Sequence, residues 1–246
     1  MKKLLKYQLS TSWVTLLVFA VVYLGIMAFA GISVSFSEGN STSQMNGTEM
    51  AVGILCFVIF VSNYGDNMRF AIQNGRSRRS IYTAALASAG LGSIMLSLYA
   101  QIIIFVSSLL LGSERISYTS MTELIYDSNH SVIGHFFKNF IFTTALLLVI
   151  AMFALVLAAA FARAGKYGRV AIAAGVPIAL FIGFPTLSGI AVIKAPAFSE
   201  MCIRLLAKVM GVESGNPYIG SLTMIIAAAV MALIIYFINR RAEIKG

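Results

Sequence analysis

Long apolar runs alternate with short polar gaps along the whole chain. Six runs lie near residues 13–34, 50–66, 81–111, 138–162, 170–193 and 218–238. At about 1.5 Å of rise per residue, most of these runs cross about 30 Å of hydrocarbon as helices. The second run is the shortest, and the third is long enough that its helix must tilt, kink or protrude. The pattern predicts an all-α polytopic membrane protein, with residues 1–246 forming one transmembrane domain of six transmembrane helices.

Basic residues occupy every second gap, which predicts the orientation of the chain. Loops rich in Lys and Arg stay in the cytosol, where anionic lipid also attracts them. The remaining gaps lean acidic or neutral, so both termini are predicted to be cytosolic. Most of the 18 Lys and Arg residues belong to four clusters: Lys2, Lys3 and Lys6; Arg69, Arg76, Arg78 and Arg79; Arg163, Lys166 and Arg169; and Arg240, Arg241 and Lys245.

Composition excludes several classes of protein. Hydrophobic residues make up 59% of the chain and charged residues 11%, whereas soluble domains carry roughly 25% charged residues. The net charge of +9 is explained by the cytosolic flanks, so it does not indicate nucleic-acid binding. Cys56 and Cys202 are too few for a disulfide framework or a zinc site.

The first apolar run has two interpretations. Basic residues precede it and Ala28-Phe29-Ala30 follows, as in a secretory signal peptide. The run from Trp13 is longer than the roughly 7–15 residues of a signal h-region, which favours an uncleaved span. Cleavage after Ala30 is the alternative, and the N-terminal sequence of the mature protein distinguishes the two.

The spans lack the residues that intramembrane chemistry needs. No Asp, Glu, Lys, Arg or His lies in the middle of a span, which disfavours a proton-coupled carrier and an intramembrane protease. Sodium coupling through backbone carbonyls stays open. Gly165-Lys166 is followed by Tyr167 and is not part of a phosphate-binding loop. We therefore expect no enzymatic activity and no ATP hydrolysis by this chain.

Small residues and prolines predict how the spans pack. Ala85, Ala89 and Ser93 recur at every fourth position, as do Gly175, Ala179 and Gly183. Such stripes allow close helix packing, within one bundle or between subunits. Pro177 and Pro185 predict a kink in the fifth span.

Two non-cytosolic gaps carry short amphipathic elements. Ser120 and Glu123 form a possible capping box. Residues 199–210 predict a longer helix that is capped by Ser199, stopped by Gly211 and lies flat at the outer surface between spans five and six. This helix either covers the bundle or closes an outer gate.

The second cytosolic gap predicts a structured element. Asp66 is suited to cap a short helix with Met68 and Ile72 on one face, and Asn74-Gly75 supplies a left-handed stop. Ser77 is suited to cap the third span. The simpler alternative is a basic anchor with a tight turn.

Residues 70–82, Phe-Ala-Ile-Gln-Asn-Gly-Arg-Ser-Arg-Arg-Ser-Ile-Tyr, resemble the stretch after the second span in permease subunits of type-2 ATP-binding cassette (ABC) exporters. The likeness is strongest to the small bacterial, Firmicute-like permeases that export lantibiotics, other peptides or drugs. The length, the six-span layout and the outer element before the last span are also similar to that family.

The resemblance implies a permease of the bacterial plasma membrane that works with a second, identical or different, permease chain. Cytosolic ABC ATPase subunits would bind ATP and Mg²⁺, and this chain would carry no cofactor or metal. The apolar spans favour export of a hydrophobic or amphipathic peptide. The alternative is a non-transporting immunity or sensor protein that binds a partner. Residues 66–75 would form the coupling helix, bordered by the arginines, so the coupling residues would be Asp66, Met68, Arg69, Ile72, Gln73, Asn74, Gly75, Arg76, Ser77, Arg78 and Arg79.

Overall fold

The computed structural model describes residues 13–35, 43–45, 47–75, 77–111, 116–126 and 132–240. This part of the chain is helical apart from two three-residue strands, β1 (Ser43–Met45) and β2 (Ile116–Tyr118), which pair in parallel. The predicted all-α class is confirmed. The helices are α2 (Trp13–Ser35), α3 (Thr48–Gln73), α4 (Arg78–Leu111), α5 (Met121–Tyr126), α6 (Val132–Arg163), α7 (Lys166–Ile178), α8 (Phe184–Lys194), α9 (Pro196–Val209) and α10 (Pro217–Arg240), and a π-helical segment, η1 (Ala179–Gly183), joins α7 to α8.

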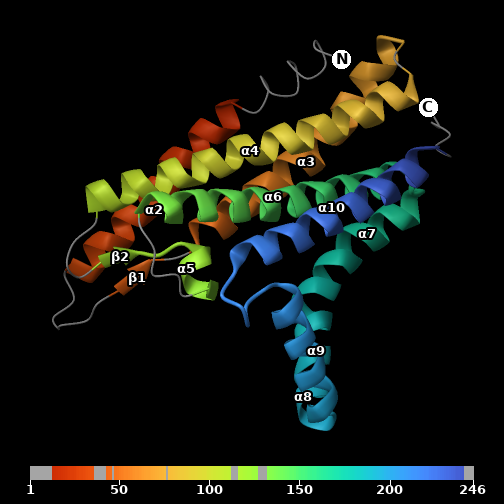
Figure 1. Cartoon of the computed structure of the whole chain (residues 1–246). Helices are drawn as coiled ribbons and strands as arrows, with labels where there is room; N and C mark the ends of the chain where they lie inside the picture. Colours follow the sequence, from red (N-terminus) through yellow and green to blue (C-terminus); the bar gives the residue numbers. More distant parts are fainter. Residues whose placement is uncertain are drawn as a thin grey trace.

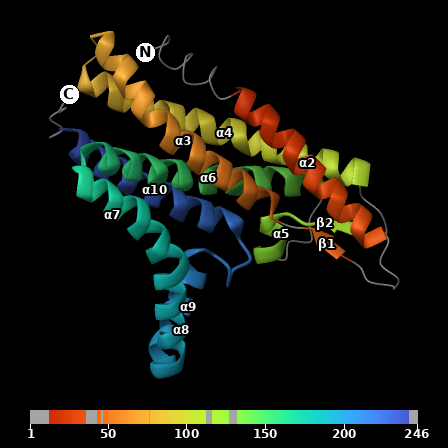
Figure 2. The ribbon, with the colours of Figure 1, turned by 180° about the vertical axis from the view of Figure 1, so that it is seen from behind.

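Helices α3, α4, α6 and α10 form an elongated bundle, and α2 lies along α3 and α4 (Figures 1 and 2). Figure 1 shows α3, α6 and α10 running in one direction and α4 in the other. Hydrogen bonds between the helices fix this register: Ser97 Oγ donates to Phe140 O at 3.1 Å, and Arg163 Nη1 donates to Ile238 O at 2.9 Å. One end of the bundle therefore holds the ends of α3, α6 and α10 and the starts of α4 and α7.

Four helices in the described part of the chain are long and apolar enough to cross a membrane. They are Thr48–Gln73, Arg79–Leu109, Phe136–Arg163 and Pro217–Ile238. They correspond to the predicted spans near 50–66, 81–111, 138–162 and 218–238, although the second of these helices ends at Leu109. The apolar stretches Thr15–Ile26 and Tyr167–Ile178 are shorter. The chain thus has the helices of a membrane protein, and the count of six spans stays a prediction.

Small residues let the bundle helices approach closely, as predicted for the first stripe. Ala85, Ala89 and Ser93 are all buried in the bundle. A Cβ atom placed on the neighbouring Gly92 would lie only 2.8 Å from the Phe60 ring on α3. The absence of a side chain at Gly92 therefore leaves the space beside α4 that the Phe60 ring of α3 occupies.

A helical arm, residues 166–209, projects from the bundle and contains α7, η1, α8 and α9 (Figure 1). The predicted kink of the fifth span is present, because the π-helical segment lies between Pro177 and Pro185. Proline has no N–H and cannot continue the i→i−4 ladder, so the helix changes its pitch and path. Arm side chains such as Leu187 and Ile193 are largely exposed. Unlike α4, the arm does not bury its small-residue stripe.

Helix α9 matches the predicted outer helix, but its first turn differs. It begins at Pro196, three positions before the predicted cap, and no side chain caps it. Ser199 instead donates its hydroxyl to Pro196 O at 2.8 Å inside the helix. Proline at the first helical position explains the earlier start. The predicted stop is confirmed, because Gly211 adopts φ +72° directly after Met210.

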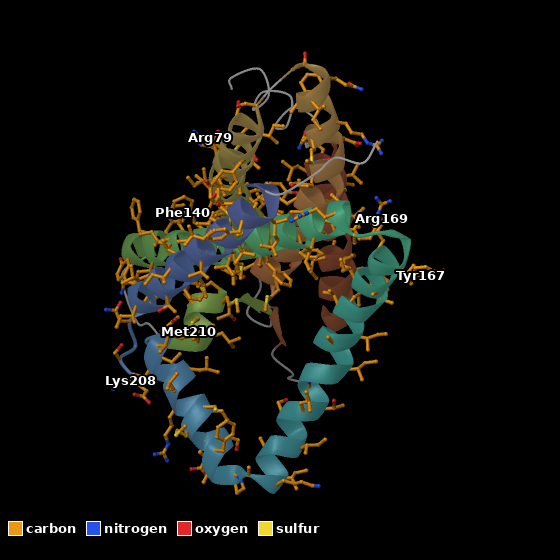
Figure 3. The ribbon with its side chains drawn as sticks, turned by 90° about the vertical axis from the view of Figure 1, so that its right-hand side faces the viewer. Arg79, Phe140, Tyr167, Arg169, Lys208 and Met210 are labelled. Atoms are coloured by element: carbon orange, nitrogen blue, oxygen red, sulfur yellow. The ribbon has the colours of Figure 1, made fainter. Side chains whose placement is uncertain are left out.

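Helix α9 also differs from the prediction in its position. It does not form a separate piece over the bundle. It meets α8 at the tip of the arm, diverges from it as the second limb, and leads the chain back to α10 (Figure 3).

Candidate functional site at the basic end of the bundle

Most of the described arginines lie at one end of the bundle, which we call the basic end. Arg69 lies in the last two turns of α3, Arg79 in the first turn of α4, Arg163 at the end of α6 and Arg169 in the first turn of α7. Figure 3 views the molecule toward this end and shows Arg79 and Arg169 on separate helices. These four residues come from the second and third predicted basic clusters, and they lie at the same end of the bundle, as the alternation of basic gaps predicted. Six members of the predicted clusters lie outside the described residues: Lys2, Lys3, Lys6, Arg76, Arg241 and Lys245.

The predicted separate coupling helix is wrong. Helix α3 continues without interruption from Thr48 to Gln73, so residues 66–73 are its last two turns. Asp66 lies inside this helix and is exposed, and an N-cap residue needs a non-helical backbone. The burial of Tyr64 and Ala71 on either side of Asp66 explains why the helix continues.

The turn between α3 and α4 has the predicted chemistry. Gly75 adopts φ +63°, the left-handed conformation expected of a helix stop. Asn74 donates to Phe70 O from its backbone N–H at 3.2 Å and from its side-chain Nδ2 at 2.7 Å. The N–H of Ser80 donates to Ser77 Oγ at 3.3 Å, so Ser77 caps α4 as predicted. Asn74, Gly75 and Ser77 thus build a fixed, tight turn.

The other predicted coupling residues divide into two groups. Met68 is half-buried and packs against the bundle core. Arg69, Ile72, Gln73 and Arg79 are exposed around the turn. Arg78 begins α4, and Arg76 lies outside the described residues. The exposed group forms a mixed apolar and basic surface at the tip of α3 and α4.

A cleft of about 1010 Å³ opens beside this turn, between α3, α6 and α7. Its walls are mainly apolar, with Phe57, Met68 and Phe161 among the side chains. Three arginines lie among the lining residues, namely Arg69, Arg163 and Arg169. No acidic residue lies among the described residues that line the cleft. Sequence reasoning missed this cleft, because it depends on α7 leaving the bundle.

Hydrogen bonds and a ring contact hold two of the cleft arginines. Arg169 Nε donates to Ala164 O at 3.1 Å, and its guanidinium carbon lies 5.9 Å from the centre of the Phe161 ring. Arg163 Nη1 donates to Ile238 O of α10. These contacts fix the corner between α6 and α7.

A buried polar cluster lies at the opposite end of the bundle. It consists of Glu49, Gln101, Thr122, Asn139 and Thr143, and each is at least nine-tenths buried. Asn139 Nδ2 donates to Gln101 Oε1 at 3.1 Å and to Glu49 Oε1 at 3.4 Å. Asn139 Oδ1 accepts from Thr122 Oγ1 at 3.1 Å and from Thr143 Oγ1 at 3.4 Å. The cluster links α3, α4, α5 and α6.

Two polar atoms of this cluster have no hydrogen-bond partner within the described part of the chain. They are Glu49 Oε2 and Gln101 Nε2. The cluster was not predicted from the sequence, because only charged residues in the spans were considered as candidates for chemistry. The available signal was Gln101 and Asn139, which are amides inside the apolar runs 81–111 and 138–162.

The capping box at α5 is confirmed. The N–H of Ser120 donates to Glu123 Oε2 at 2.9 Å, and the N–H of Glu123 donates to Ser120 Oγ at 3.3 Å. At the other end of α5, Tyr126 donates its hydroxyl to Met210 O at 2.7 Å, which ties α5 to the end of α9. Burial raises the pKa of the Tyr126 phenol. Its hydroxyl therefore keeps its proton, and can still donate, at pH values at which an exposed tyrosine ionises.

The described residues contain no group of three or more His, Cys, Asp or Glu side chains that could hold a metal ion. The arginines of the basic end are of a type that binds anions, and the side chains around the turn are exposed. No protein-family model, curated protein or solved structure matches this chain.

Proposed function

We propose that this chain is the membrane-spanning subunit of an ATP-driven exporter. In this proposal, separate cytosolic ABC ATPase subunits bind ATP and Mg²⁺ and dock at the turn between α3 and α4. A second permease chain completes the pathway in the plasma membrane of a bacterium. The resemblance of residues 70–82 to exporter permeases supports this proposal, as do the apolar bundle helices.

The observation that carries the proposal is the construction of the α3–α4 turn. Helix α3 has 26 residues, so it runs about 39 Å without a break from the far end of the bundle to the turn. Beside the turn, Ala71 of α3 and Ala84 of α4 are fully buried against each other, with Phe70 and Ile81 around them. A partner that pushes on this turn would therefore move two long helices together, as mechanical coupling to an ATPase requires.

The finer topology belongs to the same proposal. The positive-inside rule places the basic end in the cytosol together with both termini. Helix α2 would be the first span, and α7 with η1 and α8 would form a broken fifth span. Broken helices are common where transporters bind or move their substrates.

We propose a hydrophobic or amphipathic peptide as the substrate. Among the buried side chains of the described residues, Glu49 is the only one with an ionisable carboxyl or a basic group. A bundle of this kind offers few partners for a free sugar or a small ion. An apolar peptide needs fewer such partners.

Purification of the tagged chain in mild detergent from its own membranes tests the proposal. The test variant is Arg79→Glu, which reverses one exposed charge at the turn. The matched control is Arg204→Glu on α9, where the arginine is also exposed but lies far from the turn. We expect a phosphate-loop ATPase to be recovered with the wild type and the control and to be lost with Arg79→Glu.

Two results would overturn this proposal. Equal recovery of the ATPase with both variants would place the contact elsewhere than the turn. Absence of any ATPase from the wild type, under conditions that keep known transporter complexes intact, would exclude the exporter and favour the immunity or sensor protein. Size-exclusion profiles of both variants show whether each is still folded.

A further inference from the structure

The cleft between α3, α6 and α7 has the shape and charge of a binding site. Its volume of about 1010 Å³ lies at the upper limit of the roughly 300–1,000 Å³ of ligand pockets. Helix α3 contributes Phe57 and Val61, and α7 contributes Ile172 and Val176 to its apolar walls. The cleft therefore favours a ligand with a long apolar part.

The charged residues in the described lining of the cleft are arginines. Arg69, Arg163 and Arg169 come from three different helices and lie within a few turns of the basic end. The lining residues that the structure describes include no Asp or Glu. Arginine donors of this kind bind phosphate oxygens well. A ligand that fits both parts carries an anionic phosphate at one end and an apolar body at the other.

The corner of α6 and α7 also has the residues of a membrane interface. Tyr167 is 89% exposed and points away from the bundle beside Arg169 (Figure 3). Tyrosine and arginine together are typical of the level at which lipid head groups lie. Directly beyond this level, α7 is apolar and its side chains are exposed, as in Val170.

We propose that this cleft binds one anionic phospholipid from the leaflet that borders the basic end. The phosphate lies against the three arginines, and the acyl chains run along the apolar walls of α3 and α7. Basic pockets between transmembrane helices recognise anionic lipids in this way. The bilayer supplies such a lipid in excess, whereas a free phosphate would leave the apolar walls uncovered. This inference does not depend on the exporter proposal.

Native mass spectrometry of the full chain in detergent tests the inference. The probes are a phosphatidylglycerol and a phosphatidylcholine with the same acyl chains. The test variant is Arg69→Gln, because Arg163 and Arg169 also hold the backbone of the bundle. The matched control is Arg79→Gln, which removes a charge at the same end but outside the cleft. We expect Arg69→Gln to weaken phosphatidylglycerol binding about five-fold, with phosphatidylcholine binding unchanged.

A second pair of variants changes the shape of the cleft and leaves its charge intact. Ala173→Trp fills the cleft from α7, whereas the adjacent Ala174→Trp adds the same side chain outside it. We expect Ala173→Trp to reduce retention of both lipids and Ala174→Trp to reduce neither. This pair tests the site even if the arginine variants fold poorly.

Several results would overturn the inference. Equal affinity of the wild type for the two lipids would show that the charge of the head group does not contribute to binding. An equal effect of Arg79→Gln and Arg69→Gln would show only a general attraction of anionic lipid to the basic end. Displacement of phosphatidylglycerol by inorganic phosphate would identify a phosphate site that needs no acyl chain.

Discussion

Replacing Asn139 with leucine removes the central residue of the buried polar cluster. The amide of Asn139 is the common partner of Glu49 on α3, Gln101 on α4 and Thr122 on α5. Leucine has nearly the same size but neither a donor nor an acceptor. The substitution therefore leaves those three buried polar side chains short of a partner while it keeps the packing almost unchanged.

The expected magnitude follows from the number of bonds that join different helices. Asn139 makes three such bonds, and its bond with Thr143 lies within α6. Hydrogen bonds between membrane helices contribute about 0.6 to 1.7 kcal/mol each. We therefore expect Asn139→Leu to lower the free energy of unfolding by about 2 to 5 kcal/mol.

Equilibrium unfolding in mixed micelles with increasing SDS measures this loss. The matched control is Thr144→Val, since Thr144 is on the same helix and its hydroxyl donates only to Phe140 O one turn earlier, at 2.7 Å. We expect the control to shift the midpoint by less than about 1 kcal/mol in free energy. The same midpoint for both variants would refute the idea that the cluster holds the bundle together.

Two further predictions concern the contacts of α4 and α9. In the same unfolding assay, Gly92→Ala should be less stable than Gly90→Ala by about 1 to 3 kcal/mol. Only the alanine at position 92 adds a Cβ atom against Phe60 of α3. Equal stabilities of the two variants would contradict this close packing. Tyr126→Phe should speed cleavage after Glu213 by a glutamate-specific protease, because it removes the hydrogen bond to Met210 O before that turn. An unchanged rate at this bond, with cleavage elsewhere also unchanged, would show that the hydrogen bond does not hold the turn.

Local features of the fold followed from the sequence where short-range chemistry decides them. The turn at Asn74-Gly75, the cap at Ser77 and the capping box of Ser120 and Glu123 each depend on residues within four positions of one another. Such contacts form whatever the rest of the chain does. The four bundle helices were also predicted, since each is a long apolar run.

Features that depend on packing between distant segments were missed. Asp66 has the chemistry of a helix cap, but burial of Tyr64 and Ala71 keeps the helix continuous through it. The cleft exists because α7 departs from α3, and no local pattern describes that departure. The polar cluster brings Gln101 and Asn139 together from two spans, and each alone is an ordinary amide in an apolar run.

The α3 helix links the two proposed sites physically. Its last turns carry the exposed surface of the α3–α4 turn, and the same turns supply Met68, Arg69 and Ile72 to the wall of the cleft. Its other end is held by Glu49 in the buried polar cluster. The first limb of the arm is tied to the bundle at the corner where Arg169 binds Ala164 O, and its side chains beyond that corner are largely exposed. If both proposals hold, a partner at the turn and an anionic lipid in the cleft would contact the same two turns of α3. Any conformational preference that one of them imposes on these turns would then change the affinity of the other, and the effect would be reciprocal.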